Sequence, residues 1–257
     1  MQVGFLKSLC KNCGKCAGVC SVGAIIPGEG VHRIDMAKCT RCGDCVNACF
    51  YGAIVKYGEL MSSEEVFMKV KRDKMFYDSS GGGVTVSGGE PLIYPEFIYE
   101  LFSNCRDSGI NTCIETCGFV PAGSIRRVLP VTDWIYFDIK HMDLVRHKDY
   151  TGYTNELILE NAKLAAKESA HFLFRFPLVP GINDSDENIR DTAEFMKQIG
   201  PNGMDIQIMP YHRAGQTKYD ALNLAYETAG IEIMKDAGIE AVKQKFTNYG
   251  VNCTIST

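Results

Sequence analysis

The sequence has no excess of basic residues and no long apolar run. Its 27 Lys and Arg are outnumbered by 31 Asp and Glu, for a net charge of −4, so the electrostatic footprint of a nucleic-acid-binding protein is missing. No segment approaches the roughly 18 consecutive apolar residues of a membrane span. The stretch from Met1 to Lys7 leads into polar residues and cysteines, and we therefore expect no signal peptide. These absences predict a cytoplasmic protein that binds neither nucleic acid nor membrane.

Cysteine, by contrast, is abundant, and its spacing repeats. Eight of the 12 cysteines form two runs of the pattern Cys-x2-Cys-x2-Cys-x3-Cys, and after each run two further residues precede the triplet Gly-Ala-Ile. In two-cluster bacterial ferredoxins the fourth cysteine of such a run ligates the other cluster. The crossed rule predicts one [4Fe–4S] cluster held by Cys10, Cys13, Cys16 and Cys49, and a second held by Cys39, Cys42, Cys45 and Cys20.

Two alternatives for these cysteines are open. A disulfide scaffold is disfavoured by the expected reducing compartment. Four-cysteine zinc sites are common, although they usually pair two distant Cys-x2-Cys units rather than four cysteines in one run. The proline that usually follows the fourth cysteine is replaced by Ser21 in the first run and Phe50 in the second. The number of ligands is unaffected.

After the repeat, strand-like and helix-like segments alternate. Ser62 and Glu65 form a capping-box pattern that starts a helix. We expect helices over residues 62–77, 95–107, 121–129, 155–169, 186–198 and 217–237, and strands over 84–86, 110–115, 133–138, 171–176, 204–209 and 251–256. This alternation predicts an α/β fold with a parallel sheet, open or closed into a barrel.

Polar residues follow five of these strands. The segments are Ser87-Gly88-Gly89-Glu90, Glu115-Thr116-Cys117-Gly118, Asp138-Ile139-Lys140, Arg175-Phe176-Pro177 and Pro210-Tyr211-His212. In barrels of this kind, chemistry takes place at the carboxyl ends of the strands. The sequence therefore predicts a binding site at that edge of the sheet.

Together these motifs resemble the glycyl radical enzyme activating enzymes, of the type of pyruvate formate-lyase activating enzyme, a branch of the radical S-adenosylmethionine (radical SAM) superfamily. The resemblance covers nearly the whole chain. It rests on the ferredoxin-like run and on four further segments: Gly81–Pro91, Asp138–Lys140 with His147, Arg175–Pro177 leading to Pro180–Asp184, and Pro210–His212 with Gly215, Lys218 and Tyr219.

The resemblance implies a partial, open β/α barrel of residues 61–257, with a ferredoxin-like two-cluster insert in residues 1–60. It implies S-adenosylmethionine cleavage that forms a glycyl radical on a partner enzyme, fed by a flavodoxin or ferredoxin-type donor, in a monomeric protein of an anaerobic cytoplasm. By position, the implied cofactor-binding residues are Gly88, Gly89, Asp138, Ile139, Lys140, Arg175 and His212, and the implied monovalent-cation ligands are Glu115, Thr116 and Asp138.

Each of these residues also has a simpler interpretation. Asp138 and Lys140, two residues apart on one strand face, could form a local ion pair. His212 could be an ordinary loop histidine, and Glu90 a surface carboxylate. The remaining cysteines near the sheet edge, Cys113 and Cys117, are better read as small buried apolar residues than as ligands.

The sequence lacks the Cys-x3-Cys-x2-Cys motif that holds the S-adenosylmethionine-binding cluster of this family. We therefore cannot name catalytic cluster ligands, and we expect a chain without its first βα unit, inactive as written, with a third cluster in the full-length protein. The alternative is an iron–sulfur electron-transfer or scaffold protein on a degenerate barrel. A radical enzyme that acts on a small molecule is disfavoured by the resemblance alone.

Overall fold

The computed structural model describes residues 1–28 and 33–256, and the chain forms two compact units. The first comprises Met1–Leu60 and His212–Ile231, and the second comprises Met61–Tyr211 and Glu232–Thr257. The division into a ferredoxin-like domain of residues 1–60 and a barrel of residues 61–257 stays a prediction, because His212–Ile231 groups with the first unit. In the described parts of the chain, no helix is long and apolar enough to span a membrane.

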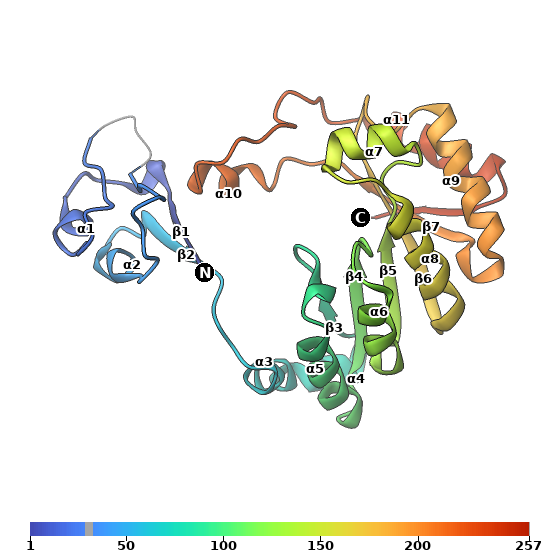
Figure 1. Cartoon of the computed structure of the whole chain (residues 1–257), viewed down its shortest axis with the longest axis horizontal. Coiled ribbons are helices and arrows are strands. Elements are labelled where there is room, and N and C mark those ends of the chain that lie inside the picture. Colours follow the sequence, from blue (N-terminus) through green and yellow to red (C-terminus); the bar gives the residue numbers. More distant parts are fainter. Residues whose placement is uncertain (29–32, 257) are drawn as a thin grey trace. The chain divides into compact units, whose positions relative to one another are not determined.

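The first unit is built on a short antiparallel pair of strands, β1 (Gln2–Phe5) and β2 (Ile54–Tyr57). Its helices are short: η1 (Lys7–Leu9), α1 (Lys15–Gly18), α2 (Asp44–Ala48) and α10 (Gln216–Ala221) (Figure 1). Helix α10 packs on β1 at Gly4, where an added Cβ would lie 3.3 Å from the Cβ of Ala221 and 2.7 Å from the Tyr57 ring. The absence of a side chain at Gly4 thus permits this contact.

The cysteine repeat is also a repeat of backbone conformation. Three positions in each copy have positive φ: Asn12, Gly14 and Gly23 in the first, and Arg41, Gly43 and Gly52 in the second. The values of the corresponding pairs are 55° and 60°, 75° and 92°, and 61° and 62°. Positive φ is costly for most residues, so its recurrence at three matching positions shows that both copies follow the same backbone path. The equal spacing of the cysteines therefore reflects two copies of one loop-and-helix unit.

The second unit is organised around six strands that are all parallel and lie in sequence order. They are β3 (Gly83–Val86), β4 (Asn111–Thr116), β5 (Trp134–Asp138), β6 (His171–Leu178), β7 (Asp205–Pro210) and β8 (Asn252–Ile255). The sheet is open, because β3 and β8 lie at its two ends and do not pair with each other. The predicted partial β/α barrel is confirmed.

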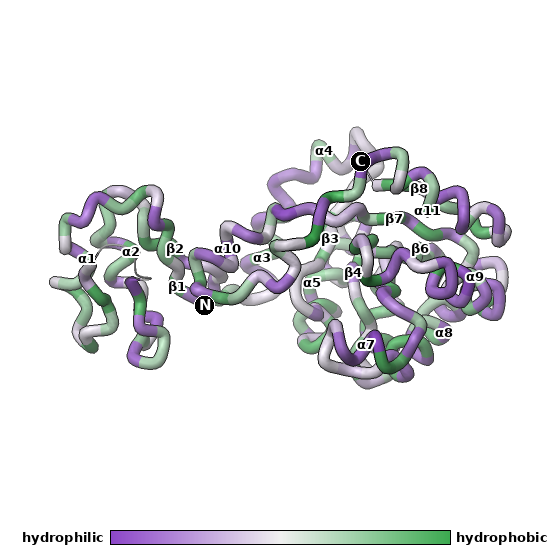
Figure 2. Tube along the Cα trace, turned by 90° about the horizontal axis from the view of Figure 1, so that it is seen from above, coloured by the Kyte–Doolittle hydropathy of each residue, from purple (hydrophilic) through white to green (hydrophobic). Residues whose placement is uncertain are grey.

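Helices cover one face of this sheet. They are α3 (Ser63–Val70), α4 (Lys74–Ser80), α5 (Pro95–Asp107), α6 (Ala122–Val128), α8 (Glu156–Glu168), α9 (Asp186–Ile199) and α11 (Asp236–Asn248), with 3-10 segments Lys71–Asp73, Pro91–Ile93, Leu129–Val131 and Pro201–Gly203. A further helix, α7 (Leu144–Thr151), follows β5 in the chain. Alternate strand residues such as Ile114, Phe137 and Phe174 are buried against the helices. The tube of α9 is largely hydrophilic, as expected for a helix with one solvent-exposed side (Figure 2).

The expected helix over residues 62–77 begins as predicted but is interrupted. Ser62 and Glu65 form the capping box: the Ser62 amide donates to the Glu65 carboxylate at 2.7 Å, and the Glu65 amide donates to Ser62 Oγ at 3.2 Å. A 3-10 turn at Lys71–Asp73 separates α3 from α4, which extends to Ser80. The prediction that this segment is helical is confirmed, and the prediction of one continuous helix is wrong.

The expected helix over residues 217–237 is wrong. The helical turns stop after Ala221, and Asn223 adopts a φ of 55°, which a right-handed helix cannot include. The last helix begins only at Asp236. Helix α7 was not expected; Asp143 caps its first turn by accepting from the Arg146 amide at 2.7 Å, and Gly152 ends it with a φ of 85°.

Candidate functional site

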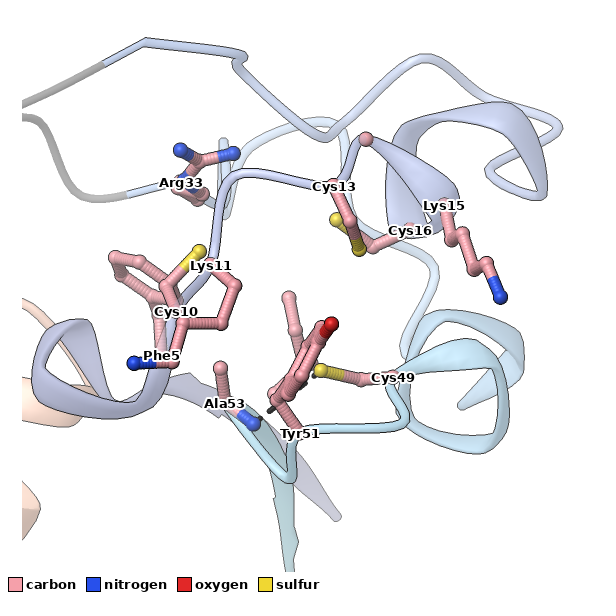
Figure 3. A pocket seen from close by; sticks show the side chains of 12 residues that line it. Phe5, Cys10, Lys11, Cys13, Lys15, Cys16, Arg33, Cys49, Tyr51 and Ala53 are labelled. Carbon is pink, nitrogen blue, oxygen red and sulfur yellow. Dashed lines mark hydrogen bonds between the residues drawn. The ribbon is translucent and has the colours of Figure 1, made fainter.

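The thiols of Cys10, Cys13, Cys16 and Cys49 surround one space in the first unit. They line one pocket, and Figure 3 shows them on opposite sides of that space, with the Tyr51 ring beside Cys49. Cys49 arrives from the second copy of the repeat because the chain returns along α2 towards β2. This is the grouping that the crossed rule predicts.

The other four cysteines of the repeat share a second pocket. Cys20, Cys39, Cys42 and Cys45 line this space. Cys20 belongs to the first copy and the other three to the second, so the crossing is reciprocal. In each site the third cysteine of its run, Cys16 or Cys45, is buried.

Backbone amides are directed at several of these sulfurs. Ala24 N donates to Cys20 Sγ and Ala53 N to Cys49 Sγ, each at 3.2 Å. The corresponding amides of Asn12 and Arg41 donate to Cys10 and Cys39 at 3.5 and 3.4 Å. Such N–H···S bonds stabilise anionic thiolate ligands and influence cluster potential.

The chemistry of these donors fits iron–sulfur clusters. Burial raises the pKa of the Cys16 and Cys45 thiols, so metal binding must supply the free energy that keeps them deprotonated. All 12 cysteines are free thiols, which disfavours the disulfide alternative. Among the described residues, no three His, Cys, Asp or Glu side chains form a set that could hold a single metal ion. Assignment of the eight cysteines as cluster ligands remains a proposal.

The second unit carries charged side chains on the sheet face opposite the helices. Strand alternation places Glu115, Tyr136, Asp138 and Arg175 there, because their neighbours in sequence are buried in the core. Register pairs Glu115 with Tyr136 and Asp138 with Arg175 on adjacent strands. The strand-end residues predicted from the sequence on β4, β5 and β6 therefore come together.

Arg175 is the centre of this group. Its guanidinium lies 4.3 Å from the centroid of the Tyr136 ring and donates from Nη1 to Glu115 Oε1 at 2.5 Å. It thus reaches from β6 across β5 to β4. Its Nε is buried and, within the described residues, has no hydrogen-bond partner. A buried N–H without a partner is rare in native proteins and calls for an explanation, such as a bound water or a ligand acceptor.

Asp138 and Lys140 form the local ion pair that the simpler interpretation predicts. Lys140 Nζ lies 3.5 Å from Asp138 Oδ2. Burial raises the pKa of Asp138 even though the charge of Lys140 opposes that shift, so its carboxylate is held in an unfavourable environment. Between them, the Ile139 side chain is buried in the core. Any ligand contact by Ile139 would therefore use its backbone.

Gly88 and Gly89 make an open turn after β3. Gly88 has a φ of 111°, which side chains disfavour, and a Cβ built at either glycine would meet no heavy atom within 4 Å. The backbone is therefore accessible to a ligand. Its exposed backbone carbonyls are acceptors of the kind that the amino group of S-adenosylmethionine requires.

Glu90 connects this turn to the end of β4. Its carboxylate accepts hydrogen bonds from Thr116 Oγ1 at 2.8 Å, from the Cys117 amide at 2.9 Å and from the Leu92 amide at 3.0 Å. Glu90 is therefore more than a surface carboxylate. The sequence signal was its place directly after the two glycines, although its partners were not foreseeable.

We expect Glu90→Gln to lower the free energy of unfolding of the second unit by about 1–3 kcal/mol, because the amide NH2 cannot accept from Thr116 or Cys117. Trp134, the only tryptophan of the chain, lies on β5, so its fluorescence during urea unfolding reports on this unit. Glu160→Gln, on the exposed side of α8, is the matched control. Equal midpoints for the two variants would contradict a connecting role for Glu90.

The implied cation ligands are otherwise engaged. Thr116 donates to Glu90, Glu115 is paired with Arg175, and Asp138 with Lys140. His212 belongs to the first unit, where its Nδ1 accepts from the Ala214 amide at 3.2 Å. The monovalent-cation site and the role of His212 therefore stay proposals.

The four cysteines outside the repeat have the properties of apolar residues. Burial raises the pKa of Cys105 and of Cys113 to about 11 and that of Cys253 to about 12, and it also raises the pKa of Cys117. Thiols of this kind stay protonated at neutral pH, so they are poor metal ligands.

Two contributors were missed in the sequence. Tyr136 was overlooked, although its position two residues before Asp138 indicates the same strand face. Asn183 was noted only within a motif; its side-chain amide donates to the carbonyls of Lys140 and Pro177 at 3.0 and 2.8 Å, and its side-chain oxygen accepts from the Val179 amide at 2.8 Å. It therefore holds the ends of β5 and β6 together.

Family comparisons agree with this geometry. Residues 41–196 match the radical SAM superfamily, and residues 2–50 match a 4Fe-4S dicluster domain. A solved domain of pyruvate-formate lyase-activating enzyme from Bacteroides vulgatus superposes with a TM-score of 0.58 and 28% identity, over 69% of this chain and 100% of that one.

Curated relatives extend the match. The choline trimethylamine-lyase activating enzyme of Oleidesulfovibrio alaskensis is 36% identical over 96% of this chain and 82% of its own length. The trans-4-hydroxy-L-proline dehydratase activating enzyme of Clostridioides difficile is 35% identical over 99% of this chain and 84% of its own length. The (2S)-3-sulfopropanediol dehydratase activating enzyme of Klebsiella oxytoca is 39% identical over 78% of this chain, which spans 65% of that relative.

An open parallel β/α sheet with charged strand ends, joined to a dicluster domain, defines a radical SAM protein. Within that superfamily the chain belongs to the glycyl radical enzyme activating enzymes, a family of oxidoreductases.

Proposed function

We propose that this protein generates a glycyl radical on a partner enzyme by reductive cleavage of S-adenosylmethionine. The observation that carries the proposal is the half-buried Arg175, whose Nε has no hydrogen-bond partner within the described residues and which lies among Glu115, Tyr136 and Asp138 at the strand ends. When bound, the clusters supply single electrons, and S-adenosylmethionine supplies the radical that removes hydrogen from a glycine. The names of the relatives support the same reaction.

The residues of the second unit divide the binding work between them. The exposed backbone carbonyls at Gly88 and Gly89 would accept hydrogen bonds from the amino group of the cofactor, and Arg175 Nε would donate a hydrogen bond to its carboxylate. Lys140 offers a further positive charge and Asp138 a counter-charge for the sulfonium. An ionised Asp138 is held by this pairing, since burial disfavours its charge. A monovalent cation bound by Glu115, Thr116 and Asp138 completes the proposed site in the second unit, and cofactor binding by His212 is a separate proposal that rests on the family resemblance alone.

The partner is defined only as a class. The curated relatives are named for different enzymes, among them a choline lyase, a hydroxyproline dehydratase and a sulfopropanediol dehydratase. Identities of 35–39% to all three give no reason to choose one. We further propose a flavodoxin or ferredoxin-type electron donor and a monomeric state. We also propose an anaerobic cytoplasmic location, because the 12 free thiols are typical of a reducing compartment.

The test assays the protein expressed from its native gene and, in parallel, the 257-residue chain, both reconstituted with iron and sulfide under anaerobic conditions. With reductant and S-adenosylmethionine, we expect the native protein to form 5′-deoxyadenosine, and to give a glycyl radical signal in electron paramagnetic resonance (EPR) spectra with its partner. We expect none from the chain alone, because it lacks Cys-x3-Cys-x2-Cys. A native protein that holds its clusters but forms no 5′-deoxyadenosine would refute the proposal.

An electron-transfer or scaffold function is the second candidate. It is favoured by the two complete four-cysteine pockets, which need nothing from the second unit. It does not explain the half-buried ion pair of Arg175 and Glu115. Calorimetry separates the candidates, since stoichiometric binding of S-adenosylmethionine by the native protein is expected only of an activating enzyme.

A further inference from the structure

The two cluster sites have similar thiols but opposite charges around them. The lining of the first site includes Lys11, Lys15 and Arg33. In the described lining of the second site, the charged residue other than its cysteines is Asp44. The repeat replaces Lys11 by Thr40 and Lys15 by Asp44 at corresponding positions. The duplicated unit has therefore diverged in electrostatics while its ligand set is unchanged.

Of these three positive charges, that of Arg33 has the strongest effect on the first site, because its side chain is buried. Its residue exposure is 5%, and its guanidinium donates to the side-chain oxygen of Asn12 and to the Gly28 carbonyl. It also lies 5.7 Å from the centroid of the Phe5 ring. These three groups are neutral, so in the described contacts the charge of Arg33 is solvated but not cancelled. An arginine stays protonated at any physiological pH.

The contacts of Arg33 place this charge at the first site. Phe5 and Arg33 both line the pocket, and Asn12, which accepts from Arg33, donates its backbone amide to Cys10 Sγ. Exposed charges are screened by water and salt, whereas a buried charge acts through a lower effective dielectric. Lys11 and Lys15 are exposed and add less.

No equivalent buried cation is found among the described residues near the second site. Arg41 has an exposed side chain outside the pocket lining and contributes its backbone amide to Cys39. Lys38 is paired with Asp35 at 3.5 Å. The charge closest to the second pocket is therefore that of Asp44, which is negative and exposed.

Reduction moves one electron from the donor to a cluster, which becomes one unit more negative while no bond breaks. A positive charge nearby stabilises the reduced form and raises the reduction potential, and a negative charge lowers it. We propose that the cluster at Cys10, Cys13, Cys16 and Cys49 has the higher potential of the two, that Arg33 is the main cause, and that the first electron is held there. The inference rests on the proposed function only in that both clusters are bound.

The test is a redox titration of the reconstituted native protein, followed by EPR spectroscopy. A Cys42→Ser variant retains the first cluster and assigns its signal. We expect Arg33→Gln to lower the ratio of electrons on the first cluster to electrons on the second at least tenfold. For one-electron couples, this corresponds to a fall of about 59 mV in the midpoint potential of the first cluster. The midpoint of the second cluster should not move.

Two matched variants separate charge from packing. Arg33→Lys keeps the charge and should retain most of the potential difference. Lys56→Gln removes one positive charge from β2, outside both pocket linings, and should change neither midpoint. If Arg33→Gln loses the first cluster, Asp44→Lys tests the same electrostatics from the other side and should raise the midpoint of the second cluster.

Unchanged midpoints in Arg33→Gln with both signals intact would overturn the inference, as would a first cluster of lower potential in the unsubstituted protein. Neither result depends on radical chemistry. A protein with unequal clusters that forms no 5′-deoxyadenosine would refute the proposed function and leave this inference standing. A protein that binds neither cluster but forms 5′-deoxyadenosine would refute this inference and leave the proposed function standing.

Discussion

We expect the iron content of the reconstituted 257-residue chain to fall from about eight to about four atoms per chain when Cys13 or Cys42 is replaced by Ser, because the two [4Fe–4S] sites are independent. Cys13 and Cys42 are the exposed cysteines of their pockets, so their replacement removes a ligand with little loss of packing. The measurement is iron and sulfide analysis with EPR spectra of the reduced protein. Cys253→Ser, outside the repeat, is the control and should retain all the iron.

The crossing of the repeats gives this experiment a second, sharper outcome. Cys20 lies in the first run but lines the second pocket, and Cys49 does the reverse. Cys20→Ser should therefore leave the same EPR signal as Cys42→Ser, and Cys49→Ser the same signal as Cys13→Ser. Signals grouped by run instead of by pocket would contradict the crossed arrangement. Loss of S-adenosylmethionine binding in Cys42→Ser would indicate a structural role for the second cluster.

Arg175→Met is expected to have the largest effect on the second unit. It leaves the carboxylate of Glu115 without its cation at a site where the two side chains are only 16% and 30% exposed. Removal of one partner of such a pair costs about 3 kcal/mol, because the remaining charge stays largely desolvated. Urea unfolding followed through Trp134 measures this loss. Adding Glu115→Gln should recover part of it, since no unpaired carboxylate remains.

Arg175→Lys separates stability from binding. Its ammonium can pair with Glu115, so most of the free energy of unfolding should be retained. It has no counterpart of the unpartnered Nε, so calorimetry on the native protein should show at least tenfold weaker binding of S-adenosylmethionine. Arg190→Lys, on the exposed side of α9, is the matched control. Unchanged affinity in Arg175→Lys would assign Arg175 a purely structural role.

Regular patterns in the sequence predicted most of the architecture. The six strands were foreseen because short β-rich runs ended in polar or Gly residues, and the sheet places those ends on one edge. The helix over residues 217–237 failed because apolar and helix-forming residues continue through the segment. The positive φ of Asn223 ends the helix there, and a single sequence does not show such a backbone choice.

For the sites, local spacing predicted which residues matter but not what they contact. Arg33 looks like an unremarkable loop residue in the sequence, and Glu90 had only its place after Gly88 and Gly89 to mark it. Their roles depend on partners 21 and 26 positions away, Asn12 and Thr116. Contacts across such separations follow from the chain path and not from periodicity.

The sequence by itself determined the cysteine ligand pattern, the alternation of strands and helices and the carboxyl-end edge that carries polar residues, because each depends on spacing along the chain. The tertiary structure alone decided that Arg175 reaches Glu115 across Tyr136 and that a buried Arg33 lies at one cluster site only. Charge acts through space and through the dielectric around it. Its effect is therefore set by burial and proximity, which exist only once the chain has folded.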